Sequence, residues 1–208
     1  MIETVQYFEQ IDQSVIDKCL NEYQNTPLIE TNGMNKNLPS QQTVQKFINI
    51  LEPLLDKKLT HRGGNYYRHS TPYNLHTDYK TYLDNTLNVV IPLVYVGNQP
   101  KLVIFDQIWD LDSVTWCMHK PVLRLGFNTG VKGCPYEYPV QKLTGSPIND
   151  DLYKNNLLRF PKETLFGLSG EAYPFEPNSM IVFDNQRIHC TSDLYQEKIG
   201  LSLRFKVN

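Results

Sequence analysis

The sequence has little of what marks several specialised protein classes. It contains only 4 cysteines among 208 residues, widely spaced and never as C-x-x-C, which favours reduced thiols over disulfides or a zinc site. It has no run near the roughly 18 apolar residues that a membrane-spanning helix needs. The N-terminus "MIETVQYFEQIDQ" lacks a basic start followed by an apolar run, unlike a secretory signal. We therefore expect a cytoplasmic protein with no membrane partner.

An excess of charge of either sign is also lacking. Lys plus Arg total 20 against 22 for Asp plus Glu, and the formal net charge is −2. Without a broad basic field to hold a phosphate backbone, no nucleic acid partner is expected. With 40% hydrophobic residues, the composition is typical of a single globular domain spanning residues 1–208.

Helical spacing of apolar residues dominates the first third of the chain. The segments "DQSVIDKCLNEY" (12–23) and "SQQTVQKFINILEPLLDKKL" (40–59) both carry it, and Ser40 is placed to cap the second. We expect residues 1–60 to form a helical support.

From about Arg62 the sequence indicates strands. Short runs of β-branched and aromatic residues are separated by Gly, Pro, Asn and Asp. The clearest runs are 86–96, 101–106, 179–185, 187–192 and 199–207. No helical pattern alternates with them, which favours an antiparallel sandwich or barrel in an α+β, mainly β, protein. Residues 61–208 form the expected core, and 107–175, with both tryptophans, reads as a long insertion.

The stretch "NLHTDYK" places His76 and Asp78 two residues apart. By itself this pair is also explained by a polar turn with an Asx-type hydrogen bond. The distant His189, however, lies in "MIVFDNQRIHCTS", beside a very apolar run, where a buried imidazole needs a partner such as a metal ion. Two histidines and one carboxylate can occupy one face of an octahedron, as in non-haem Fe(II) oxygenases.

The last run, "EKIGLSLRFKV", alternates between an apolar and a basic side. Lys198 and Arg204 share one parity, while the apolar residues share the other. An inward-facing cation at either position offers a charge partner for a dicarboxylic acid held beside the metal. A solvated strand charge is the alternative.

This ordered set resembles the 2-oxoglutarate and Fe(II)-dependent dioxygenases with a double-stranded β-helix, or jelly-roll, core. The resemblance covers about residues 60–208 and is closest to the prolyl-hydroxylase-like or phytanoyl-CoA-hydroxylase-like branches. The family motif is H-x-D, a distant histidine and a basic residue about ten positions later. Here these are His76, Asp78, His189 and, nine positions on, Lys198.

The resemblance implies a jelly roll with N-terminal helices packed on one sheet, binding Fe(II) through His76, Asp78 and His189. It implies 2-oxoglutarate as cosubstrate, hydroxylation of an unidentified small molecule or protein side chain, and succinate and CO₂ as coproducts. Residues placed near the cosubstrate are Tyr66, Tyr73, Asn88, Lys198 and Arg204, where one or both of the last two bind its carboxylates.

The chain departs from the family pattern in two respects. His189 follows His76 by 113 positions, which the insertion explains, and lysine stands where the family usually has arginine. Substrate-lining candidates from the loop after the motif and from the insertion are Tyr79, Tyr82, Trp109, Trp116, Arg124 and Asn128. The alternative function is a non-catalytic, cupin-like binding module whose metal site is absent or differently used.

Overall fold

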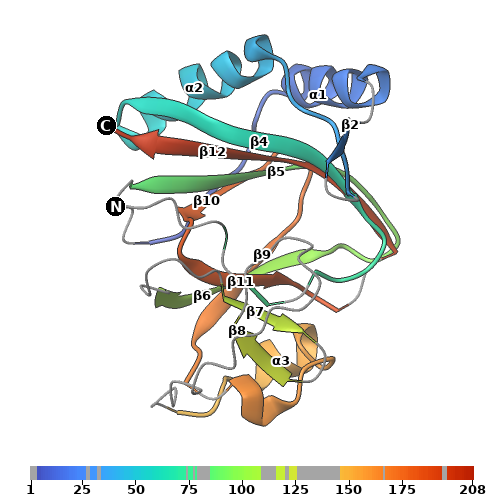
Figure 1. Cartoon of the computed structure of the whole chain (residues 1–208), viewed down its shortest axis with the longest axis vertical. Coiled ribbons are helices and arrows are strands. Elements are labelled where there is room, and N and C mark those ends of the chain that lie inside the picture. The colour runs from blue at the N-terminus through green and yellow to red at the C-terminus, as the bar shows by residue number, and fades with distance from the viewer. Residues whose placement is uncertain are drawn as a thin grey trace.

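Two antiparallel sheets face each other in this computed structural model, and helices cover the outer face of the larger sheet (Figure 1). The structure describes residues 4–26, 29–31, 34–73, 75–76, 78, 85–108, 116–119, 122–125, 146–165, 167–193 and 196–208. None of the helices within these ranges is long and apolar enough to cross a membrane.

The larger sheet has the strand order β1-β10-β5-β12-β4. Its strands are β1 (Gln6–Phe8), β4 (Leu59–His69), β5 (Thr86–Val96), β10 (Met180–Asp184) and β12 (Glu197–Val207). The smaller sheet has the order β11-β6-β9, with β6 (Lys101–Ile108), β9 (Gly170–Pro174) and β11 (Arg187–Thr191). The five strand runs expected from the sequence all form strands. The short strand β1 was not expected, because it lies within the segment assigned to helical support.

Helices α1 (Gln13–Asn25) and α2 (Gln41–Leu55) lie where the apolar spacing predicts them. Asp12 and Ser40 cap them by accepting hydrogen bonds from backbone amides, which satisfies donors that a helix leaves unpaired at its start. Phe47 and Leu51 on α2 are fully buried against Leu203 and Phe205 of β12 in one apolar cluster. The apolar side of β12 therefore faces the helices, and its basic side faces the smaller sheet.

The region expected to be an insertion is shorter than predicted. The structure extends β6 to Ile108 and pairs β9 with β6 as a core strand, so the expected end at residue 175 is wrong. Between them lie the paired strands β7 (Trp116–His119) and β8 (Val122–Leu125), helix α3 (Asp150–Asn156) and the 3₁₀ helix η1 (Lys162–Leu165). A separate two-stranded pair, β2 (Ile29–Thr31) and β3 (Met34–Lys36), joins the two N-terminal helices.

The segment around α3 and η1 covers the outer face of the smaller sheet. Leu157, Phe160 and Leu165 pack there with Val103 of β6 and with Leu75, which directly precedes the first histidine of the motif. The metal-ligand candidates thus lie between two apolar layers, one on each side of the sandwich.

Candidate metal centre

His76 and His189 lie next to each other although they are far apart in the chain. The His76 amide donates to the His189 carbonyl at 2.9 Å, and the His189 amide donates back to the His76 carbonyl at 2.8 Å. This reciprocal antiparallel pair fixes the two residues side by side at the edge of β11. Both imidazoles are buried, with 6% and 5% of the residue exposed.

The three ligand candidates of the sequence motif converge. Nε2 of His76 lies 3.8 Å from Oδ1 of Asp78, and Nε2 of His189 lies 3.7 Å from Oδ2 of the same carboxylate. One ligand atom from each residue falls within 4.8 Å of the other two. Two imidazole nitrogens and one carboxylate oxygen are the donor set of the facial iron site. The residues therefore fit a divalent metal ion chemically.

The hydrogen bond of His189 orients its ring for metal binding. Its Nδ1 lies 2.9 Å from the backbone carbonyl of Arg187, which can only accept a hydrogen bond, so Nδ1 carries the proton. Burial, together with the nearby Arg204 and Lys198 charges, lowers the pKa of His189. A neutral ring with a protonated Nδ1 presents a free electron pair on Nε2.

Asp78 is held in its ionised form, as a metal ligand must be. Burial alone would raise the pKa of Asp78, but the Arg204 guanidinium and the Asn88 amide oppose it, and the pKa lies below its usual value. Nη2 of Arg204 lies 3.7 Å from Oδ1, and the Asn88 side-chain amide donates to Oδ2. The structure thus brings Arg204 and Asn88 to the predicted site.

Lys198 lies on the same face of β12 as Arg204 but deeper between the sheets. The residue is only 2% exposed, and its Nζ lies 4.7 Å from the centroid of the Phe175 ring and 5.9 Å from that of Tyr67. Burial lowers the pKa of Lys198 to about 7. Between the two basic residues lie Gly200 and Ser202, both small, and the Tyr67 and Phe175 rings pack closely over Gly200.

Tyr66, predicted to lie near the cosubstrate, is placed elsewhere, and this expectation is corrected. The side chain faces the helices, where its ring packs against Tyr23, with centroids 5.9 Å apart, and its residue is 1% exposed. The neighbouring Tyr67 faces the interior instead and packs over Gly200. A Cβ added to Gly200 would lie only 2.5 Å from the Tyr67 hydroxyl oxygen.

Strand β4 carries a bulge close to its start. Phe205 pairs with His61 whereas Arg204 pairs with Gly63, so one residue of β4 is extra and the alternation of faces shifts. Gly63 has φ +149°, a conformation that side chains with a Cβ rarely adopt. Tyr66 was expected near the cosubstrate because of its distance from His76 in the family pattern, and that distance does not report which face of β4 a residue occupies. Two adjacent glycines within a predicted strand, here Gly63 and Gly64, are the sequence signal for a bulge.

Tyr73, expected near the cosubstrate, lies beside the metal-ligand candidates, and His69 is a neighbour that the sequence did not indicate. The Tyr73 ring meets the His76 ring edge-on at 4.5 Å and stacks on His69 at 5.2 Å. Burial and the Lys198 charge lower the pKa of His69 to about 4, so this ring is neutral. Aromatic rings thus run from the candidate metal centre along β4 toward Lys198.

The substrate-lining candidates are mostly not placed. Tyr79, Tyr82, Trp109 and Asn128 lie outside the described residues, and Trp116 and Arg124 belong to β7 and β8, whose backbone alone is described. The predicted thiols at Cys19 and Cys190 are free and buried, and burial raises their pKa values to about 11 and about 12. Neither is therefore a reactive nucleophile.

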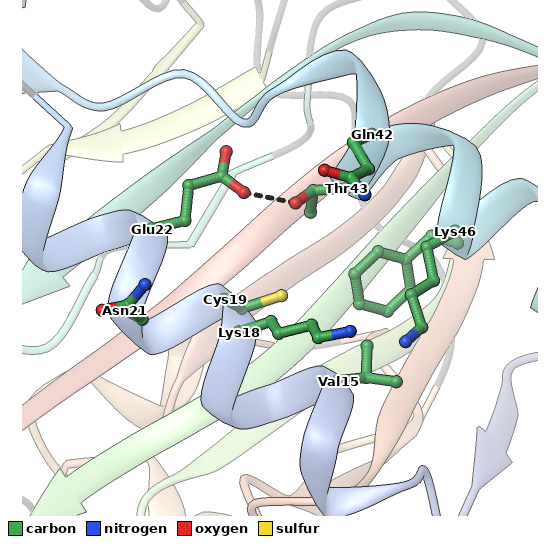
Figure 2. Close-up of a pocket in the computed structure, with 9 residues that line it drawn as sticks. Val15, Lys18, Cys19, Asn21, Glu22, Gln42, Thr43 and Lys46 are labelled. Carbon is green, nitrogen blue, oxygen red and sulfur yellow. Dashed lines mark hydrogen bonds between the residues drawn. The ribbon is translucent and has the colours of Figure 1, made fainter.

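A separate hollow of about 330 Å³ lies between α1 and α2 (Figure 2). Its lining includes Lys18 and Lys46, and the Thr43 hydroxyl donates to the Glu22 carboxylate across it. The helices cover the outer face of the larger sheet, so this hollow lies on the far side of that sheet from the candidate metal centre.

No family model and no curated protein matches the chain, but solved structures do. The non-haem alpha-ketoglutarate-dependent epimerase SnoN from nogalamycin biosynthesis aligns with a TM-score of 0.56 at 10% identity, over 97% of this chain and 78% of that one. EctD from S. alaskensis aligns with a TM-score of 0.54 at 12% identity, over 97% and 72% of the chains. The resemblance inferred from the sequence is thereby confirmed for the fold.

A third aligned structure was determined with bound ligands. HygX from Streptomyces hygroscopicus, with nickel, 2-oxoglutarate and hygromycin B bound, aligns with a TM-score of 0.52 at 9% identity, over 97% of this chain and 82% of that one. The chain thus has the jelly-roll fold that these oxygenases share.

Proposed function

We propose that the protein is an Fe(II)- and 2-oxoglutarate-dependent dioxygenase that hydroxylates a small molecule or a protein side chain. The observation that carries this proposal is the convergence of His76, Asp78 and His189 on one point between the sheets. The alternative, a turn at residues 76–78, does not explain why a distant histidine has its Nε2 3.7 Å from Asp78. The aligned oxygenases support the same assignment through their fold.

His76, Asp78 and His189 would hold the iron. When bound, iron and cosubstrate supply the chemistry in which 2-oxoglutarate, O₂ and a C–H bond give succinate, CO₂ and an alcohol. The chain keeps Asp78 ionised through Arg204 and Asn88, and it keeps the His189 ring neutral and oriented through the Arg187 carbonyl. These groups therefore preorganise the ligands before any metal binds.

In this proposal, Lys198 and Arg204 each bind one of the two carboxylates of 2-oxoglutarate. Arg204 lies too close to Asp78, at 3.7 Å, to serve the end of the cosubstrate that is remote from the metal. Lys198 lies further along the same face and is buried among aromatic rings. We assign the distal carboxylate to Lys198, with the Tyr67 hydroxyl as its neighbour, and the metal-side carboxylate to Arg204.

Oxidation of 2-oxoglutarate by the purified protein tests the function. We expect Mn(II)-dependent binding of 2-oxoglutarate by calorimetry, and Fe(II)-dependent formation of succinate and CO₂ in equal amounts. Asp78→Ala and His76→Ala should reduce 2-oxoglutarate binding and succinate formation by at least 100-fold, because each variant leaves only two protein ligands for the metal. Asp150→Ala is the matched control, since Asp150 forms only exposed ion pairs.

Binding of the metal and of 2-oxoglutarate also distinguishes a dioxygenase from a cupin-like module. Because 2-oxoglutarate turnover is slow without the true substrate, the binding measurement distinguishes the two functions when no succinate is detected. Wild-type protein that takes up neither Fe(II) nor Mn(II) and does not consume 2-oxoglutarate would establish the binding module instead.

A further inference from the structure

Arg159 lies outside the motif, in the turn after α3, yet it contacts both segments that carry the metal-ligand candidates. One guanidinium nitrogen, Nη2, donates to the Tyr73 carbonyl at 2.9 Å and to the Thr191 carbonyl at 2.7 Å. These two carbonyls belong to residues three positions before His76 and two positions after His189. A single side chain therefore bridges the two ligand segments.

Arg159 is itself held in place by contacts with Asp193 and Phe160. The other terminal nitrogen, Nη1, forms an ion pair with Asp193, and the Arg159 backbone amide donates to the same carboxylate at 3.2 Å. The guanidinium carbon lies 4.2 Å above the Phe160 ring. Both charged side chains are largely buried, 21% and 14% exposed, so the pair is only weakly screened by solvent.

Other hydrogen bonds also join the described residues of the two ligand segments. His76 and His189 share their reciprocal backbone pair, and the Tyr73 amide donates to the Thr191 hydroxyl at 2.6 Å. The Tyr73 carbonyl also accepts two longer bonds, from the Thr191 amide at 3.3 Å and from the Thr191 hydroxyl at 3.4 Å. Removing the guanidinium would take from the carbonyls of Tyr73 and Thr191 the shortest of the side-chain bonds that they accept and would remove the cation partner of Asp193, at the point where the segments meet.

We propose that Arg159 is a positioning residue that clamps the segment before His76 to the segment after His189, and so sets the spacing of the metal ligands. The inference rests on the proposed function for its metal, but the clamp itself is a property of the polypeptide. Through these hydrogen bonds, the segment around α3 and η1 supports the centre from behind.

Metal affinity and amide exchange together test the clamp. Arg159→Ala should weaken Mn(II) binding about 10-fold to 100-fold, the range typical of groups that orient metal ligands. In metal-free protein, the His76 and His189 amides should lose hydrogen-exchange protection while amides within α2 keep theirs. The Mn(II) affinity and the amide protection of Arg159→Lys should lie between those of the wild type and Arg159→Ala. An ammonium can keep the ion pair with Asp193, but it lacks the forked donors that reach both carbonyls.

Two controls separate positioning from general stability. Leu165→Ala empties part of the same apolar layer and lowers the unfolding temperature, but it leaves every Arg159 contact in place and should keep Mn(II) affinity. Arg68→Ala breaks the Arg68–Glu197 pair, with Nη2 2.7 Å from the carboxylate, and should change neither readout.

Three results would overturn the clamp: unchanged Mn(II) affinity and unchanged exchange in Arg159→Ala, an equal loss of affinity in Leu165→Ala, or exchange that rises throughout the molecule. If wild-type protein binds no divalent cation, the proposed function fails by itself. The selective loss of protection at His76 and His189 would then still establish the clamp, because that measurement needs no metal.

Discussion

The buried ammonium of Lys198 connects pH to the proposed cosubstrate site. Burial among Phe175 and Tyr67 disfavours its charged form, and its pKa of about 7 lies far below the ordinary lysine value of 10.5. The charge is therefore present below pH 7 in the free protein and is lost as pH rises above it. A carboxylate that binds there restores the charge by favouring the protonated form.

We predict that 2-oxoglutarate binding weakens as pH rises above 7, by up to about 10-fold per pH unit, because the fraction of protonated Lys198 falls at that rate. Lys198→Arg should remove this slope, since arginine stays charged. Calorimetric titration with Mn(II) present, between pH 6.5 and pH 9, measures both. Identical slopes in the two proteins would show that Lys198 does not bind the distal carboxylate.

Gly200 shows how one missing Cβ shapes the proposed cosubstrate site. An added Cβ would lie 2.5 Å from the Tyr67 hydroxyl oxygen, closer than real contacts allow, and 3.0 Å from the Phe175 ring, which is a tight contact. We predict that Gly200→Ala displaces Tyr67 and lowers 2-oxoglutarate affinity about 10-fold while Mn(II) affinity is retained. Ser202→Ala, on the same face of β12, is the control, and equal affinities in both variants would contradict the prediction.

Among the elements, α1 and α2 are joined by a polar contact that serves the fold and not the metal centre. The Glu22 carboxylate of α1 accepts a hydrogen bond from the Thr43 hydroxyl of α2 (Figure 2). It also accepts one from the Ser40 amide, at the start of α2. One acidic side chain thus holds the N-terminus of the second helix against the first.

Replacing Glu22 should therefore cost stability only. We predict that Glu22→Ala lowers the free energy of unfolding by about 0.5 to 1.5 kcal/mol, the usual net contribution of a hydrogen bond that water can partly replace. Urea denaturation measures it, and Asp17→Ala, on the exposed face of the same helix, should change little. Mn(II) affinity should match the wild type, and a parallel loss would mean that the helices determine the metal geometry.

Strand parity predicted the two sides of β12, whereas the face of Tyr66 was not predicted. On β12 the pairing with β4 is regular from Lys198 to Arg204, so the apolar residues face the helices and the basic ones face the interior, as predicted. Tyr66 was expected near the cosubstrate from its distance to His76 in the family pattern, and that distance does not report the face of β4 on which it lies. The bulge near Gly63 also interrupts the alternation on β4, and periodicity is informative only where each strand residue has one partner.

In the whole molecule, metal binding should raise stability, because the ligands come from segments that unfolding separates. We predict that Mn(II) at 100 times its Kd stabilises the protein by about 2.7 kcal/mol, measured as a higher unfolding temperature than in EDTA. Asp78→Ala should show no such difference. A metal-induced rise of equal size in that variant would place the cation at another site.

The sequence by itself determined the helices at 13–25 and 41–55 and the strand cores, because apolar periodicity and caps are local properties. It also singled out His76, Asp78 and His189, whose residue types and order suffice to indicate a metal. Only the tertiary structure decided that the three converge, that Lys198 and Arg204 lie at different depths, and that Arg159 joins the ligand segments. These facts depend on register, a bulge and contacts between distant parts of the chain, and no local pattern encodes them.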